Sequence, residues 1–188
     1  MTPESPTLPV ITERSSRYAR RVLHVITPAQ AQALQGVIDG SYRNAAAQHG
    51  RSPQTYKKQL SIVRSNIREH IINTVGFEEE AGRDPLSVAI IWAVDNDAVE
   101  TYRLPETYLD TLTAREREIA QWVIYGYNDN AICEQLYIAP TTVRVHRVNI
   151  YDKLRIPHEN SDFTKRYTLV AMGARERRLE HLRKSQQI

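Results

Sequence analysis

The sequence predicts an all-α protein built from two small four-helix, helix-turn-helix domains in tandem. Three observations lead to this expectation: apolar residues recur at helical spacing along most of the chain, Gly or Pro marks the segment ends, and two stretches of sequence resemble each other. A chain of 188 residues with 41% hydrophobic residues can bury one ordinary core or two small ones.

The internal similarity has two parts. Residues Ile26–Gly40 (ITPAQAQALQGVIDG) align with Leu112–Gly126 (LTAREREIAQWVIYG), and Ser52–Ile67 aligns with Ala139–Leu154. A further apolar segment follows each copy, over Pro85–Val94 and Tyr167–Met172. The alternative interpretation is chance similarity between amphipathic helices. We expect a flexible basic lead over 1–25, a diverged domain over 26–95, a linker over 96–111, a second domain over 112–180 and a tail over 181–188.

Charge is segregated along the chain. The formal net charge is +3, yet residues 77–110 hold nine acids and two bases, which leaves the remainder at +10. Such segregation favours basic faces that meet a polyanion, although solvated surface charge is an equally simple explanation. No apolar run reaches the ~20 residues that a bilayer span needs, and the start lacks a signal-peptide pattern. We expect a soluble, cytoplasmic protein without membrane contact.

The second copy can be followed helix by helix. Thr113 and Glu116 have the spacing of a capping box, and Gly126 should end that helix. Asn128 can cap a second helix ending at Leu136, after which residues 137–139 form a tight turn. Pro140 suits the first turn of a third helix.

The third helix, residues 140–154, carries the functional prediction. Its apolar positions Val143, Ile150 and Leu154 share one face. Arg144, Val145 and Val148 fall on a stripe opposite that core. Arg can bond guanine through two hydrogen bonds and Val can touch a thymine methyl, so this stripe is typical of a helix that enters the major groove.

These residues resemble the LuxR/GerE helix-turn-helix domain, which also forms the output domain of NarL-like response regulators. The resemblance covers roughly Leu112–Arg178. The matching positions are Leu112, Thr113, Arg115, Glu116, Arg117, Glu118, Gly126, Ile132, Leu136, Ile138, Thr142, Val143, Arg144, His146, Asn149, Ile150, Tyr151, Lys153 and Leu154.

The resemblance implies a sequence-specific transcriptional regulator that binds double-stranded DNA and is not an enzyme. Arg144, Val145 and Val148 would face bases. Thr141, Thr142, Arg147, Asn149 and Lys153 would lie near the phosphate backbone. It also implies that a fourth helix, around Asp162–Arg178, can form a homodimer contact.

Three positions depart from the family pattern. Cys133 replaces a small Ala where two helices meet, and Tyr137 stands where Gly is common in the turn. Ala139 replaces a capping Ser or Thr, a loss that costs about 1 kcal/mol in typical helices.

The first copy is more diverged. Ala46, Gly50 and Ser52 keep the expected small contact, turn and cap, but His49 and Arg51 fall at core positions. Either the helix is shifted or that corner is open to water. The presumed third helix presents Lys57, Lys58, Ser61 and Arg64, which favours phosphate contact. The competing interpretation is a scaffold or dimerisation domain, and the apolar segment Val88–Trp92 is then either core or a protein interface.

Other chemistry finds little support. The lone Cys133 excludes an internal disulfide and is most simply a small buried residue. No phosphate-binding Gly-rich loop, metal-ligand pattern or recombinase motif is present, so we expect no cofactor, no metal and no catalytic residue. The alternative function is a protein-binding module that sequesters another regulator or contacts RNA polymerase. In that context the run Glu78–Glu80 is a solvated loop or a contact for a basic partner. A sigma-factor-like promoter reader is a third possibility, because the last domain of such a protein is also a helix-turn-helix. The absence of an evident polymerase-binding helical domain in this sequence argues against it.

Overall fold

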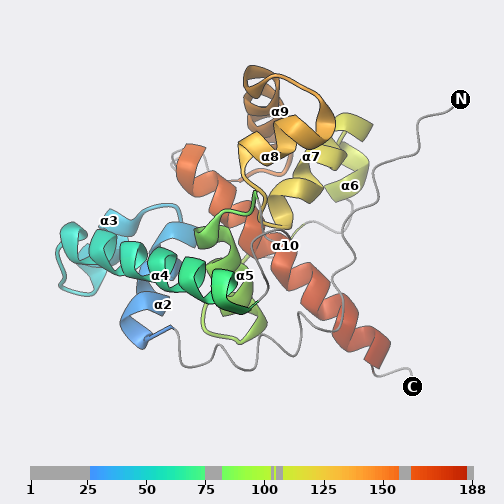
Figure 1. The fold of residues 1–188 in the computed structure, drawn as a ribbon. Helices are drawn as coiled ribbons and strands as arrows, with labels where there is room; N and C mark the ends of the chain where they lie inside the picture. Colours follow the sequence, from blue (N-terminus) through green and yellow to red (C-terminus); the bar gives the residue numbers. More distant parts are fainter. Residues whose placement is uncertain (1–25, 75–81, 103, 105–107, 157–161, 186–188) are drawn as a thin grey trace, which may run out of the picture.

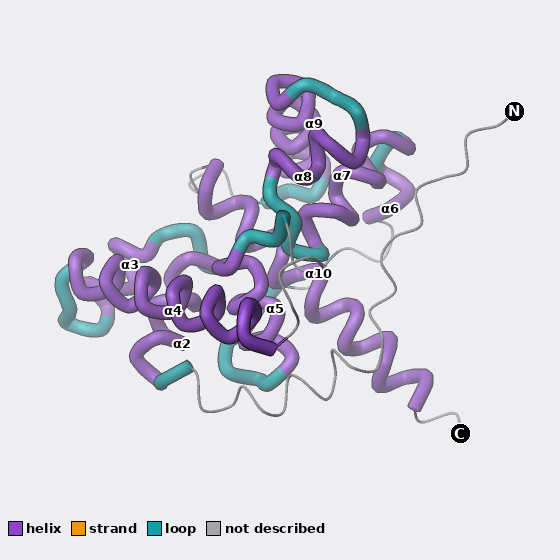
Figure 2. The backbone as a smooth tube through the Cα atoms, viewed as in Figure 1, coloured by secondary structure: helices purple, strands orange, loops and turns teal. Residues whose placement is uncertain are grey.

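The computed structural model describes residues 26–74, 82–102, 104, 108–156 and 162–185, and all its regular elements within these ranges are helices (Figures 1 and 2). The fold is therefore all-α over the described residues, as predicted. The expected lead over 1–25 and the acidic run Glu78–Glu80 lie outside them. Within these ranges no helix combines the length and apolar character that a bilayer crossing needs.

The N-terminal unit comprises four helices: α2 (Pro28–Ile38), α3 (Tyr42–Gln48), α4 (Pro53–Thr74) and α5 (Pro85–Asp95). Helix α2 opens with a capping box, in which the backbone N–H of Thr27 donates to Gln30 Oε1 at 2.7 Å. Ser41 caps α3 and Asp84 caps α5. Gly40 lies at φ 91°, a backbone conformation that favours glycine and lets the chain turn sharply between α2 and α3.

The C-terminal unit comprises α6 (Tyr108–Thr111), α7 (Ala114–Ile124), α8 (Asp129–Leu136), α9 (Pro140–Lys153) and α10 (Asp162–Ser185). The predicted capping box of Thr113 and Glu116 is confirmed, as is the Asn128 cap of α8. Gly126 follows α7 at φ 87°. Helix α10 continues to Ser185, so part of the predicted tail over 181–188 is helical.

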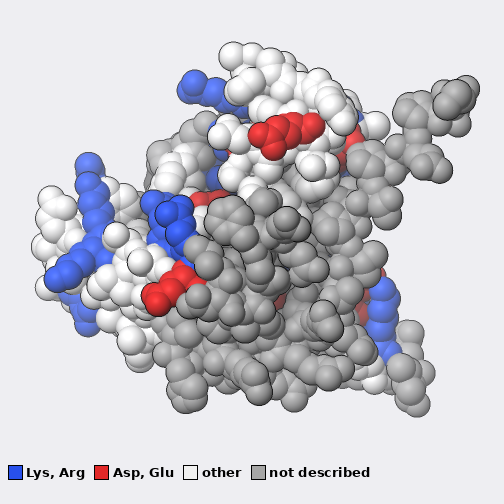
Figure 3. All heavy atoms as spheres, in the orientation of Figure 1, with Lys and Arg blue, Asp and Glu red and all other residues white. Residues whose placement is uncertain are grey.

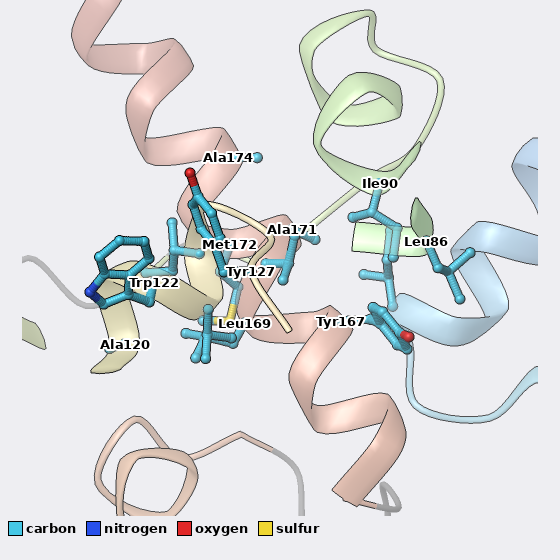
Figure 4. Packing of buried hydrophobic residues seen from close by; sticks show 14 of the residues in the cluster. Leu86, Ile90, Ala120, Trp122, Tyr127, Tyr167, Leu169, Ala171, Met172 and Ala174 are labelled. Carbon is cyan, nitrogen blue, oxygen red and sulfur yellow. The ribbon is translucent and has the colours of Figure 1, made fainter. Parts of the chain in front are cut away.

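Helix α10 joins the two units. It packs against α5 and α2 on one side and against α7 on the other. Figure 4 shows Leu86 and Ile90 of α5 on one side of α10 and Trp122 of α7 on the other, with Leu169, Ala171 and Met172 of α10 among them. Most buried apolar residues of both units form one continuous cluster, and Ala33, Ala46 and Tyr56 form a second, small one within the N-terminal unit. The two units therefore share a core, which the expectation of two linked domains does not include.

Two predictions about the N-terminal unit are resolved by burial. Ile90 is fully buried and Trp92 is 8% exposed, while Val88 and Ile91 are half-buried against the same cluster. The segment Val88–Trp92 is thus core rather than a free protein interface. His49 and Arg51 are exposed, so the corner that they occupy is open to water.

Polar contacts also tie the units together. The backbone N–H of Asp84 donates to the Gly126 carbonyl at 2.8 Å, and that of Asn128 donates to the Gly82 carbonyl at 2.7 Å. The Thr168 hydroxyl of α10 donates to the Ile38 carbonyl of α2 at 2.6 Å. These bonds hold loops and helices of one unit directly against the other.

The expected linker over 96–111 is partly packed. Gln35 and the Glu100 backbone exchange two hydrogen bonds, of 2.7 and 3.1 Å, and Leu104 is only 2% exposed. Arg178 of α10 bonds both the Asp97 carboxylate and the Val94 carbonyl. These parts of the segment lie against the core instead of forming a free tether.

Candidate nucleic-acid interface

The turn before α9 sets the direction of that helix. Tyr137 adopts a left-handed conformation, with φ 52°, and its side chain is 94% exposed. The backbone N–H of Ile138 donates to the Cys133 carbonyl at 3.2 Å, which closes the end of α8. Arg115 of α7 donates to the Leu136 carbonyl at 2.8 Å. The predicted three-residue turn is confirmed, and a tyrosine occupies the position that glycine would fill without strain.

Helix α9 begins at Pro140, directly after Ala139, which makes no side-chain capping bond. Its buried face consists of Val143, Ile150 and Tyr151, followed by Leu154, which is 3% exposed. These residues pack against α7 and α8. The predicted core face is confirmed, and one side of the helix is firmly seated on the rest of the unit.

The opposite face of α9 is open. Val145 is 58% exposed, Val148 is 42% exposed, and Arg144 is exposed between the turn and these two valines. Single exposed apolar side chains are common on protein surfaces, but these two lie together on one helical stripe. An arginine beside two exposed valines on one helical stripe therefore forms a surface suited to base edges and methyl groups.

The five residues expected near phosphate separate into two groups. Thr141 and Asn149 are exposed and Thr142 is half-buried. Arg147 is 11% exposed and lies 3.2 Å from an Asp129 carboxylate oxygen, while the Lys153 ammonium lies 2.6 Å from Glu116 Oε2. The structure thus leaves the hydroxyl and amide groups open and engages both cations inside the unit.

Glu116 links the start of α7 to the end of α9. Its carboxylate accepts from the Thr113 backbone and from Lys153, and the side chain is 4% exposed. Burial alone would raise the pKa of Glu116, but these hydrogen bonds and the positive charge of Lys153 outweigh it, so the pKa is lowered from its ordinary value. The carboxylate is ionised at neutral pH and holds α9 in place.

Asp129 is a second such junction. It accepts from Arg147 of α9 and from Arg166 of α10, whose Nη1 lies 2.8 Å away. Arg166 is 7% exposed and also donates to the Tyr127 carbonyl. An open hollow of about 260 Å³ lies beside this group. Sequence reasoning missed the Asp129–Arg147–Arg166 junction, because its members are 18 and 19 residues apart and no local pattern links them.

The remaining predicted positions are placed as follows. Cys133 is half-buried rather than fully buried, packs against the core, and has its pKa raised mainly by burial. Among the described residues no His, Cys, Asp and Glu side chains gather in a way that would hold a metal ion. Lys57, Lys58, Ser61 and Arg64 of α4 are all exposed, so the predicted first-unit stripe lies on the surface.

A helix seated on one face, open on the other and preceded by a tight turn from a shorter helix defines the class of the C-terminal unit: a helix-turn-helix domain. Residues 110–161 match the family described as bacterial regulatory proteins, luxR family. This segment thus matches the LuxR-type helix-turn-helix domain that the sequence resembles.

Curated relatives share this part of the chain. A probable transcriptional regulatory protein NarL of Mycobacterium tuberculosis is 28% identical over 119 residues, 63% of this chain and 50% of its own length. The transcriptional regulatory proteins FixJ of Rhizobium meliloti and UhpA of Escherichia coli are 40% and 38% identical over 53 and 50 residues, 27% of this chain and 26% of each relative. The chain thus spans about half the length of the NarL protein and about a quarter of the length of FixJ and of UhpA. No solved structure matches.

Proposed function

We propose that this protein is a DNA-binding transcriptional regulator that reads a duplex through the major groove with α9. The observation that carries the proposal is the open stripe of Arg144, Val145 and Val148 on a helix whose other face is buried. The relatives' names as transcriptional regulators and the luxR-family match support the same function.

Each residue of the stripe has a chemical role in this proposal. The Arg144 guanidinium would donate two hydrogen bonds to O6 and N7 of a guanine, and Val145 and Val148 would contact thymine methyl groups. Thr141, Thr142 and Asn149 would bond phosphate oxygens and fix the register of the helix. Arg147 and Lys153 would act mainly by holding α9 through Asp129 and Glu116, and would contact phosphate from those positions.

We further propose that residues 26–95 are a diverged copy of the same domain. Three local features support the correspondence: capping boxes open both α2 and α7, left-handed glycines follow both helices, and left-handed residues precede both α4 and α9. Pro53 and Pro140 then begin the presumed third helix of each copy.

A homodimer through α10 would have limited surface to use. Most residues from Thr164 to Ala174 are buried by this chain's own helices, and only the final turns, Glu180–Ser185, are exposed throughout. The alternative function, a protein-binding module, loses its main surface because Val88–Trp92 lies in the core. Both points favour DNA, rather than another protein, as the partner of this chain.

The experiment that tests this function is selection of bound duplexes from a random pool, followed by titration of the selected sequence. Arg144→Ala should cost about 1–3 kcal/mol at one base position and relax the preference there. Arg183→Ala, an exposed arginine on the last turn of α10, is the matched control and should leave the preference intact. An unchanged base preference in Arg144→Ala would exclude the proposed role of α9.

A further inference from the structure

The surface of α3 and α4 has an unusual charge composition. From Ser41 to Arg68 the chain holds six Lys and Arg residues and no Asp or Glu. All six are exposed (Arg43, Arg51, Lys57, Lys58, Arg64 and Arg68), and the acid Glu69 follows them on α4, also exposed. Figure 3 shows blue Lys and Arg side chains gathered at the α3–α4 end of the molecule, with one red patch beside them, whereas the surface over α7–α9 in the same view is largely white, with red patches and with blue side chains at its edge.

The cations of α4 are not paired with carboxylates in the way that Arg147 and Lys153 of α9 are. Within the described part of the chain, no carboxylate lies in salt-bridge distance of Lys57, Lys58 or Arg64. Lys57 lies over the ring of Tyr42, 5.9 Å from its centroid, which orders the side chain without neutralising its charge. On α9, by contrast, Arg147 and Lys153 both pair with acids.

The spacing on α4 directs this charge outward. Lys57, Lys58, Ser61 and Arg64 occupy positions i, i+1, i+4 and i+7, which share one side of a helix. Tyr56, Val63 and Ile67 are buried on the other side. An exposed row of cations with a short hydroxyl between them fits a chain of phosphates better than it fits base edges.

The core makes α4 and α9 parts of one body. Helix α4 packs on α5 and α2, both of which pack on α10, and α10 packs on α7 beneath α9. The bonds from Thr168 to Ile38 and from Asn128 to Gly82 cross between the units. A duplex held by both surfaces would therefore be held in a single binding event, without a flexible tether to order.

We propose that the exposed basic face of α4, Lys57, Lys58, Ser61 and Arg64, is a second contact surface for the duplex that α9 reads. It binds phosphates and supplies much of the sequence-independent affinity, whereas α9 supplies base preference. This inference rests on the proposed DNA-binding function. It adds to that function a separate role for each unit: phosphate binding by α4 and base reading by α9.

The test compares two double variants of the full chain that each remove two exposed cations: Lys57→Gln/Lys58→Gln on α4, and Arg183→Gln/Lys184→Gln at the end of α10. Affinity is measured from 50 to 300 mM salt by fluorescence anisotropy, on a 30-bp duplex with the selected sequence and on one of random sequence. Circular dichroism and thermal melting verify folding. Because each phosphate contact contributes about 0.9 to the slope of log K against log salt, the α4 variant should lose about 2 from that slope.

The outcomes separate this inference from the proposed function. Lys57→Gln/Lys58→Gln should weaken binding to both duplexes by the same factor and keep the base preference, while the α10 control keeps the wild-type slope. A wild-type slope in the α4 variant, or an equal loss in the control, overturns the second surface. Arg144→Ala changing nothing, while the α4 variant loses salt dependence, would instead overturn base reading by α9 and leave the α4 surface standing.

Discussion

Helices α4 and α9 start in the same way but are held differently. Each follows a left-handed residue and begins with proline, yet α4 has Gly50 and a Ser52 cap where α9 has Tyr137 and the uncapped Ala139. Helix α9 also has long-range contacts at its middle and its end: Arg147 binds Asp129 and Lys153 binds Glu116. A helix that lacks good local turn chemistry can thus be fixed by tertiary bonds.

The same difference governs the surfaces that the helices present. The two α9 cations that pair with acids, Arg147 and Lys153, are less available to a polyanion, and the open stripe of this helix presents Arg144 beside two valines. The cations of α4 are exposed, and a local cap is present at its start. A cation that pairs with an acid to hold a helix is less available to a partner. The two units of this chain differ in this respect, because Arg147 and Lys153 of α9 are paired and the cations of α4 are exposed.

The largest expected effect tests whether the units are one folding unit. Ile90 of α5 is fully buried in the shared cluster, so Ile90→Ala should lower the free energy of unfolding by about 2–5 kcal/mol. Trp92 lies in the N-terminal unit and Trp122 in the C-terminal unit. The Trp122→Phe background leaves Trp92 as the fluorescent probe, and the Trp92→Phe background leaves Trp122, so fluorescence in urea reports on each unit separately.

Both probes should shift by the same amount, because the core is continuous. Val145→Ala, on the exposed face of α9, is the control and should change stability by less than about 0.5 kcal/mol. If Ile90→Ala moves the Trp92 transition and leaves that of Trp122 in place, the units unfold independently and the shared core is not cooperative.

A smaller effect tests how α9 is anchored. Glu116→Gln should lower stability by about 1–2 kcal/mol at pH 7, since it removes the charge that binds Lys153 and weakens the capping box. The pKa of Glu116 is lowered in the folded chain. Its contribution is therefore complete above the unfolded-state pKa of about 4.3 and disappears as pH falls through the folded value.

The stability difference between wild type and Glu116→Gln should accordingly shrink below pH 4, as measured by urea denaturation at a series of pH values. Glu134→Gln, at an exposed position of α8, provides a matched control with little effect at any pH. A difference that persists unchanged down to pH 2 would show that the ionised carboxylate does not anchor α9.

Features set by neighbouring residues were predictable from sequence. The Thr113–Glu116 capping box, the Asn128 cap and the left-handed Gly126 depend on bonds within a few positions, so their patterns identify them. The exposed stripe of α9 followed from helical periodicity. The pairing of Arg147 and Arg166 with Asp129 could not be predicted in this way, because it depends on how α8, α9 and α10 are oriented. The shared core depends on the same long-range packing.

The smallest effect exchanges the local chemistry of the two helices. Ala139→Ser gives α9 the cap that α4 already has, and should raise the free energy of unfolding by about 1 kcal/mol. Ser52→Ala removes the bond that the Thr55 backbone N–H donates to Ser52 Oγ at 3.2 Å, and should lower it by about the same amount. Urea denaturation measures both. Equal and opposite shifts would mean that a local cap adds to the tertiary contacts that hold α9. No gain from Ala139→Ser would mean that the missing cap carries no cost in a helix already held at its middle and end by Asp129 and Glu116.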